Sequence, residues 1–374
     1  MEKHRVNTLN NCNFVGSIIL SDGLTEIGGG ALGNCRNLKT VVIPKTVTKI
    51  GPNAFMGSGL KSITLLDGRL TEIGGCAFYN CRNLEAVVIP ETVTKIGPGA
   101  FAWSGLKSIT LSDGRLTEIE EDAFSGCNNL ESVVIPETVT KIGPNAFAYS
   151  GLKSIILPYQ PNRLTKIGKN AFRNCRNLET VIIPKTVTKI GRYAFAESGL
   201  KSIILPYQSK GLTEIEEGAF YECENLETVV IPKTVTKIGS DAFTRSGLKS
   251  ITLLDGRLTE IGGCAFYRCG NLETMVIPKT VTEIGSYTFE DSGLKSITLP
   301  NGLTEIGDYA FCGCHNLKTV VIPKTVTKIG PNAFWRSGLK SIILPYGVEI
   351  GEDAFRDCHN LAIKYRNKSQ YILQ

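Results

Sequence analysis

Apolar residues recur along the chain in a pattern that repeats every 22 to 25 residues. The pattern alternates between two half-units, which read L-T-E-I-G-x-x-A-F-x-x-C-x-N-L-x-x-V-V-I-P and V-T-K-I-G-x-x-A-F-x-x-S-G-L-K-S-I-x-L. A fixed period in this range is typical of a solenoid, whose coils bury their apolar sides against one another. We therefore predict one elongated domain of about fifteen coils of ~23 residues.

Each coil also carries a β-branched segment that ends at a proline, as at Lys39 to Ile43 before Pro44. β-Branched residues favour strands, and proline cannot continue a hydrogen-bonded ladder. We expect these segments to stack as a parallel sheet on the concave face. A shorter extended run follows, in which Val47 and Ile50 point inward before Gly51 ends it.

Two further columns of like positions follow from the period. Fourteen of the fifteen phenylalanines share one repeat position, which predicts an aromatic column through the core. The residue before the second inward isoleucine is Glu or Lys, and its sign alternates between most neighbouring coils, as at Lys49 and Glu72. Opposite charges on adjacent strands stabilise a sheet by about 0.2–1 kcal/mol per pair. We interpret this column as a surface ladder that sets the register, rather than as a catalytic carboxylate site.

The motif I-G-x-x-A-F-x-x-C/S, followed by I-P-x-T-V-T-K-I-G, resembles that of the bacterial surface protein A (BspA)-like leucine-rich repeat proteins. The resemblance covers about residues 15–361 and departs from the pattern at Leu32, at Thr288 and after Leu361. It implies a leucine-rich repeat solenoid, a β-rich, α/β-type horseshoe. It also implies a surface or secreted protein that adheres to extracellular matrix or to other cells.

The ends of the chain depart from the repeat. We interpret residues 1–23 as an N-terminal arm with a partial capping coil, residues 24–361 as the solenoid, and residues 362–374 as a C-terminal capping tail. A solenoid end has to be covered, because its last coil otherwise exposes strand edges and apolar core.

Composition narrows the classes of partner. The net charge of +6 arises from 41 basic and 35 acidic residues without a long basic block, so nucleic acid is not indicated. We expect no membrane span. The N-terminus has no apolar stretch of signal-peptide length. Either export is absent, and the protein is cytoplasmic, or a leader was removed.

Eight of the twelve cysteines occupy one repeat position in every second coil. Successive members of this column would lie roughly 10 Å apart, which is beyond the ~7 Å between Cα atoms that a disulfide tolerates. We therefore expect buried, unpaired thiols. The column consists of Cys35, Cys81, Cys127, Cys175, Cys223, Cys269, Cys314 and Cys358.

No constellation of catalytic residues stands out. Histidine is scarce, and no nucleophile, base and orienting group recur together. The run Cys312-Gly-Cys314-His315 would offer two thiolates and an imidazole to zinc. Because Cys314 belongs to the buried column, we expect Cys312 and His315 alone to face outward and no metal to bind. The sequence thus predicts no enzyme, no catalytic residue, no metal and no cofactor.

What remains is surface. The concave strands should present a continuous uncharged face of β-branched and hydroxyl residues, which either binds a partner or reflects strand propensity alone. Two longer edge turns add Tyr159 and Tyr207, because tyrosine supplies much contact area with few torsions to order. The candidate residues on the concave face are Val88, Thr110, Val134, Ile156, Ile182, Ile204, Val230, Thr252 and Val276.

These features favour a non-enzymatic protein-binding module that engages its partner through the concave sheet. Solenoids characteristically use their concave surfaces in this way. The alternative is a structural or self-associating repeat protein, in which the face or the solenoid ends pair between copies. We expect a monomer or weak self-association. Sedimentation across protein concentrations distinguishes a protein-binding module from a self-associating repeat protein.

Overall fold

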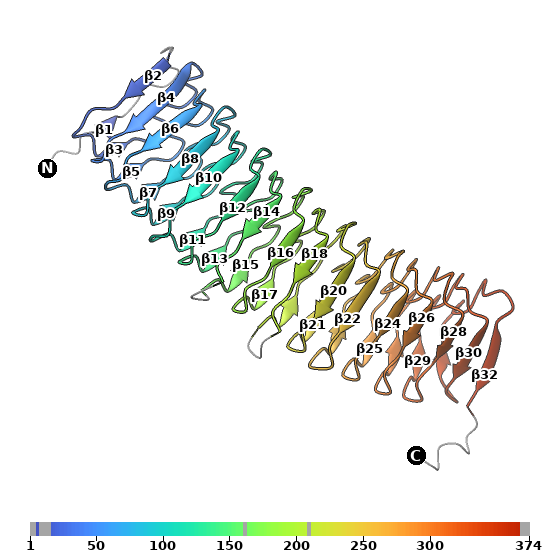
Figure 1. Ribbon diagram of the computed structural model, residues 1–374. Coiled ribbons are helices and arrows are strands. Elements are labelled where there is room, and N and C mark those ends of the chain that lie inside the picture. Colours follow the sequence, from blue (N-terminus) through green and yellow to red (C-terminus); the bar gives the residue numbers. More distant parts are fainter. Residues whose placement is uncertain (1–4, 7–15, 160–162, 208–210, 367–374) are drawn as a thin grey trace. The chain divides into compact units, whose positions relative to one another are not determined.

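The structure is a computed structural model that describes residues 5–6, 16–159, 163–207 and 211–366. The chain divides into two compact units, Met1–Val187 and Thr188–Gln374. In each unit, every coil contributes one longer and one short strand, and like strands of successive coils pair in parallel (Figure 1). The described residues contain no helix, so the side opposite the longer strands is built from short strands and turns. The predicted leucine-rich repeat solenoid is confirmed.

The first unit contains strands β1 to β16. Its longer strands are β2 (Gly16–Ile19), β4 (Leu38–Ile43), β6 (Ser62–Leu65), β8 (Ala86–Ile89), β10 (Ser108–Leu111), β12 (Ser132–Val134), β14 (Ser154–Ile156) and β16 (Thr180–Ile182). Its short strands are β1 (Arg5–Val6), β3 (Glu26–Ile27), β5 (Lys49–Ile50), β7 (Glu72–Ile73), β9 (Lys95–Ile96), β11 (Glu118–Ile119), β13 (Lys141–Ile142) and β15 (Lys166–Ile167).

The second unit contains strands β17 to β32. Its longer strands are β18 (Ser202–Ile204), β20 (Thr228–Ile231), β22 (Ser250–Leu253), β24 (Thr274–Val276), β26 (Ser296–Thr298), β28 (Thr319–Val321), β30 (Ser341–Leu344) and β32 (Ala362–Tyr365). Its short strands are β17 (Lys189–Ile190), β19 (Glu214–Ile215), β21 (Lys237–Ile238), β23 (Glu260–Ile261), β25 (Glu283–Ile284), β27 (Glu305–Ile306), β29 (Lys328–Ile329) and β31 (Glu349–Ile350).

The alternation of side chains along a longer strand sets which residues face out. In β8, Val87 and Ile89 are buried, while Ala86 and Val88 are exposed. Pairing with β10 places Thr110 directly beside Val88. Because side chains alternate with a period of two, this register puts the outward residues of successive coils in one line.

The predicted phenylalanine column is confirmed in both units. In the first unit, the rings from Phe55 to Phe172 stack with centroids 5.0 to 5.6 Å apart. In the second, the rings from Phe195 to Phe355 stack at 5.0 to 5.7 Å, with planes at most 13° apart. Such offset stacking adds about 0.5–1.5 kcal/mol per pair to the burial of the rings.

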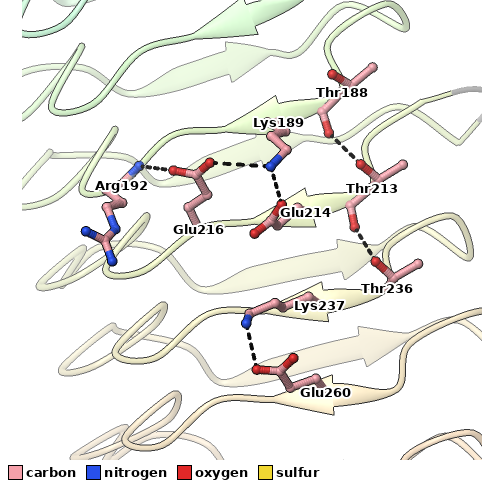
Figure 2. Close-up of polar contacts among 9 residues, drawn as sticks. All are labelled: Thr188, Lys189, Arg192, Thr213, Glu214, Glu216, Thr236, Lys237 and Glu260. Atoms are coloured by element: carbon pink, nitrogen blue, oxygen red, sulfur yellow. Dashed lines mark hydrogen bonds and ion pairs between the residues drawn. The ribbon is translucent and has the colours of Figure 1, made fainter.

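Threonine hydroxyls tie each coil to the one before it, which explains the P-x-T-V-T motif. The Thr46 hydroxyl donates to the Leu24 carbonyl at 2.7 Å, and the Thr48 hydroxyl donates to the Thr25 carbonyl at 3.1 Å. The same contact in the second unit joins Thr236 to Thr213 at 3.1 Å (Figure 2). The Thr25 and Thr213 carbonyls also accept the backbone amides of Thr48 and Thr236, at 2.8 and 2.9 Å, so these hydroxyls add a second bond to an existing backbone contact between coils.

At the C-terminal end, strand β32 extends the ladder of longer strands. It pairs with β30 from Ala362 to Tyr365, and the amides of Ala362 and Arg366 donate to the carbonyls of Lys340 and Leu344. All four residues of β32 are exposed, so the strand covers the backbone edge of β30 and not the half-buried Phe355. Residues 367–374 of the predicted capping tail lie outside the described residues. We propose that β32 caps the solenoid.

Deleting residues 362–374 is therefore expected to destabilise the second unit and to promote association. Each backbone hydrogen bond lost costs about 1 kcal/mol, and 1 kcal/mol moves the melting temperature of a unit of this size by roughly 2–4 °C. Calorimetry and sedimentation measure both effects. A deletion of residues 367–374 alone is the control, because it keeps β32. Unchanged melting of the longer deletion would refute the capping role.

Candidate binding surface

The sequence-predicted residues of the concave sheet lie on the outward positions of the longer strands. The apolar ones except Val230 expose 45% to 65% of their surface, whereas Val230 is half-buried, and Thr110 and Thr252 are exposed. In the first unit these residues are Val88, Thr110, Val134, Ile156 and Ile182, and in the second they are Ile204, Val230, Thr252 and Val276. We call this surface the longer-strand face of each unit.

A second outward column, of hydroxyl residues, runs beside the first. Ser108 and Ser132 begin strands β10 and β12, and both are exposed. In the second unit, Ser250 and Thr274 take this place and lie side by side in the ladder. The longer-strand face therefore offers uncharged apolar and hydroxyl groups in a regular array.

The two edge tyrosines are exposed, Tyr159 by 59% and Tyr207 by 55%. Each belongs to a different unit, and each follows a buried Pro, at 158 and at 206. Residues 160–162 and 208–210 of these turns lie outside the described residues. Both rings are thus accessible to a partner. Their role as contact residues stays a prediction.

An aromatic cluster in the turns of the second unit was not predicted. Tyr287 and Tyr309 stack with centroids 4.8 Å apart, and Trp335 meets Tyr309 edge-on at 6.3 Å. Trp335 in turn donates from Nε1 to Asp357 Oδ2 at 3.0 Å. Tyr287 and Tyr309 share one repeat position, directly before the Ala/Thr-Phe pair, which was the signal available in the sequence.

The Glu and Lys residues that begin the short strands form a charged surface. As the sequence predicted, many of these side chains pair with an opposite charge on a neighbouring coil. Figure 2 shows Lys189 between Glu214 and Glu216, and Lys237 with Glu260 at 2.7 Å. The hydrogen bond that the Lys189 ammonium donates to Glu214 raises the pKa of Lys189. Exposed pairs of this kind stabilise a protein by about 0–1 kcal/mol each. They set the register between coils.

The column cysteines from Cys81 to Cys358 are free, and so are Cys76, Cys264 and Cys312. Each of these column thiols donates to the phenylalanine carbonyl of the preceding coil, as from Cys175 to Phe147 at 3.1 Å, and contacts a serine hydroxyl of that coil. The alternation of Cys and Ser at one repeat position therefore forms buried Cys–Ser pairs.

Two expectations about the cysteines are wrong. Cys35 is disulfide-bonded, and since the other column members are free, its partner lies outside the column. The spacing argument compared column members only with one another, so it could not exclude such a partner. Cys312 is buried at 4% exposure rather than outward-facing, and its thiol donates to Glu290 Oε1 at 3.8 Å.

Thiol reagents at about pH 8 are expected to modify few cysteines in the folded protein and most after unfolding, because thiolates react and buried thiols stay protonated. Cys127, Cys175 and Cys223 are fully buried. Mass spectrometry after brief alkylation counts the modified sites. Fast native labelling of Cys175 or Cys223 would contradict this assignment, whereas the half-exposed Cys76 serves as the reactive reference.

Alkaline pH is expected to destabilise the protein through the same thiols. Burial raises the pKa of Cys127 and Cys175 from 9.0 to about 11. Because the folded-state pKa exceeds the unfolded one, this stability is present below about pH 9 and is lost as pH rises through about 11. A shift of this size corresponds to about 2–3 kcal/mol per thiol. Urea unfolding measured across this range should show a shallower loss for Cys175→Ala; equal losses would contradict the assignment.

Metal and membrane features were also sought. The described part of the chain holds no group of three or more His, Cys, Asp or Glu side chains placed to bind a metal ion. Nor does it contain a helix long and apolar enough to cross a membrane.

The stacked parallel strands, the phenylalanine column and the coil length together define a leucine-rich repeat solenoid. A model of the BspA type leucine rich repeat region matches residues 2–114, 48–164, 159–257 and 247–362. The chain belongs to this BspA-type leucine-rich repeat family. Such repeat proteins are generally protein-interaction modules and typically not enzymes.

Solved structures show the same fold. A leucine-rich repeat protein from Bacteroides ovatus is similar with a TM-score of 0.60 and 23% identity, over 97% of this chain and 94% of that one. The pneumococcal vaccine antigen PcpA is similar with a TM-score of 0.51 and 19% identity, over 97% of this chain and 92% of that one. Comparison with curated proteins gives no match.

Proposed function

We propose that the chain is a non-enzymatic binding module whose longer-strand face contacts a protein partner. The observation that carries this proposal is the line of outward Val, Ile and Thr side chains, with Val276 65% exposed and Ile156 61% exposed. Regular apolar surface of this kind is typical of interaction sites. A rigid backbone ladder holds these side chains, so binding orders few groups and loses little entropy.

We further propose that the protein works at the cell surface or after secretion, in adhesion to extracellular matrix or to a host cell-surface protein. Membership of the BspA-type family supports this location. The disulfide at Cys35 supports it independently, because disulfides persist mainly in oxidising compartments. The fully buried column thiols need no such compartment, since burial alone keeps them protonated.

The test is binding of the purified chain to immobilised extracellular-matrix proteins. Two face variants place a carboxylate on the longer-strand face of each unit, Ile156→Glu in the first and Val276→Glu in the second. The matched controls Asn83→Glu and Asn225→Glu add the same charge at exposed turn positions. We expect the face variants to lose binding while melting like the controls. Equal binding by all four variants would remove the face from consideration.

The edge tyrosines form a separate contact in this proposal. Tyr159→Ser and Tyr207→Ser remove exposed rings without touching the longer-strand face. If the edges contribute, each substitution weakens binding, and Tyr346→Ser tests the third exposed tyrosine that follows an I-L-P segment. Unchanged affinity of the Tyr159 and Tyr207 variants excludes the edge turns.

Self-association is the second candidate, and strand β32 is the observation that favours it. Ile363 and Tyr365 are exposed by 42% and 54% on this last described strand, whose outer edge has no partner among the described strands. An accessible edge strand can pair with another copy. Sedimentation across concentrations measures this directly, and Ile363→Lys should abolish any dimer formed through the edge.

A further inference from the structure

The turns of the second unit form a basic pocket, and none of its residues belongs to the predicted binding surface. It has a volume of about 530 Å³ and is lined by His315, Lys318, Arg336, Ser337, Gly338, Lys340, Asp357 and His359. These residues come from three successive half-units that surround strands β28 and β30. The volume lies within the roughly 300–1,000 Å³ range of small-molecule sites.

The charge of the pocket departs from the repeat pattern. In other coils a lysine at this place pairs with a glutamate of the preceding coil, as Lys249 does with Glu227 at 2.7 Å and Lys295 with Glu273 at 2.6 Å. Lys340 occupies the position of Lys249, but Lys318 stands where Glu227 would be. The backbone contact between the two coils is kept, since the Lys340 amide donates to the Lys318 carbonyl at 2.8 Å.

The two lysines are held without carboxylates. Lys318 Nζ donates to the His315 carbonyl at 2.9 Å, and Lys340 Nζ donates to the His359 carbonyl at 3.1 Å. No carboxylate of the described residues forms an ion pair with Lys318, Lys340 or Arg336. Like charges on neighbouring strands destabilise a sheet, so this arrangement costs stability that the usual Glu–Lys pair would provide.

Arg336 completes the cluster. Its side chain is exposed, and its guanidinium lies 5.6 Å from the ring centre of Trp335. The carboxylate in the lining, Asp357, accepts a hydrogen bond from Trp335 Nε1 at 3.0 Å. Three permanent donors therefore face the pocket, and a guanidinium is well suited to bidentate contacts with phosphate or sulfate oxygens.

The equivalent hollow of the first unit shows that the repeat backbone creates the cavity while the sequence supplies its charge. That hollow has a volume of about 370 Å³ and contains Trp103 at the place of Arg336 and Asn128 at the place of His359. Its single cationic lining residue is Arg82. The same geometry is thus close to neutral in one unit and strongly basic in the other.

We propose that the pocket around Lys318, Arg336 and Lys340 binds a small ligand that carries more than one phosphate or sulfate group. Inorganic pyrophosphate and a doubly sulfated disaccharide are the probes, and their relative affinities decide between phosphate and sulfate as the source of the oxyanions. Calorimetric titration at low ionic strength should show saturable binding that weakens as salt is added.

Lys318→Glu is the decisive variant, because it restores the Glu–Lys pair of the other coils. It should fold at least as stably as the parent chain and bind either probe roughly tenfold more weakly or not at all. Arg336→Gln should also weaken binding. The matched control is Lys39→Glu, which makes the same charge change at the same repeat position beside Lys61, where Gly57 stands in place of Arg336. It should leave affinity unchanged.

Two outcomes overturn the proposal. One is the absence of saturable binding for both probes at low ionic strength. The other is an equal loss of affinity in Lys318→Glu and Lys39→Glu, which would mean that the probes respond to net charge alone. Neither outcome affects binding of a protein partner through the longer-strand face, which is tested by separate variants.

Discussion

Replacing Phe243 by alanine is expected to destabilise the second unit by about 3–5 kcal/mol, the usual cost of removing a buried phenylalanine. The Phe243 ring is fully buried between Phe220 at 5.2 Å and Phe266 at 5.5 Å. Removing it leaves a cavity and also interrupts the stack on both sides. Since each coil contacts only its neighbours, the coils on either side cannot close the gap without breaking strand pairing.

Thermal unfolding followed by calorimetry measures this loss, and a fall in melting temperature of roughly 6–20 °C is expected for a unit of this size. Val276→Ala is the control, because it removes an exposed side chain and should change stability by less than about 0.5 kcal/mol. Hydrogen exchange should place the weakened protection in β20, β22 and β24. A loss below about 1 kcal/mol would mean that the aromatic column contributes little to the fold.

The regular parts of the fold were predictable because each rests on one residue choice repeated in every coil. Lys39 to Ile43 reads as a strand before a proline, and the structure has β4 at Leu38–Ile43. Alternating charge predicted the pair between Lys49 and Glu72, which are 2.9 Å apart. Periodicity alone fixed which positions face inward, because only one register buries the isoleucines of the short strands and the phenylalanine column together.

The contacts between coils were not predictable in the same way. The hydrogen bonds from threonine hydroxyls and from thiols to backbone carbonyls depend on how far one coil is shifted against the next. The repeat pattern does not indicate the size of that shift. The basic pocket escaped for the same reason, since Lys318, Arg336 and His359 are far apart in the sequence. Its signal in the sequence was the break in charge alternation at Lys318 and Lys340.

The sequence correctly predicted which residues form the longer-strand face. That this face binds a partner stays a proposal. Strand alternation placed Val88 and Ile156 outward, and the structure gives both more than half of their surface to solvent. Whether such side chains bind a partner or only favour the extended backbone is a question of affinity that packing does not answer. The variants at Ile156 and Val276 separate these two readings, because a carboxylate there disturbs binding and leaves the buried face intact.

The glycine of the S-G-L-K segment, which occurs in every second coil, is expected to be the most sensitive small residue of that coil. A Cβ atom at Gly247 would lie 2.0 Å from the Glu224 carbonyl oxygen, and one at Gly59 would lie 1.9 Å from the Arg36 oxygen. Gly247 itself donates to the Cys223 carbonyl at 3.1 Å. The glycine is therefore required by the close approach of one coil's backbone to the next.

Gly247→Ala is accordingly expected to cost about 3 kcal/mol or more, at or above the upper end for overpacked sites, because the obstructing atoms belong to the backbone and cannot rotate away. Gly270→Ala is the matched control, since a Cβ there meets no atom within 4 Å. The control should be neutral or stabilise the protein by about 0.4–1 kcal/mol through the unfolded chain. Urea unfolding measures the change in the free energy of unfolding for each variant. If backbone contact is the cause, Gly247→Ala lowers this free energy, whereas Gly270→Ala leaves it unchanged or raises it. Similar small effects at both positions would show that the coils can separate enough to admit a methyl group, and the close stacking of the backbone would then not limit the sequence.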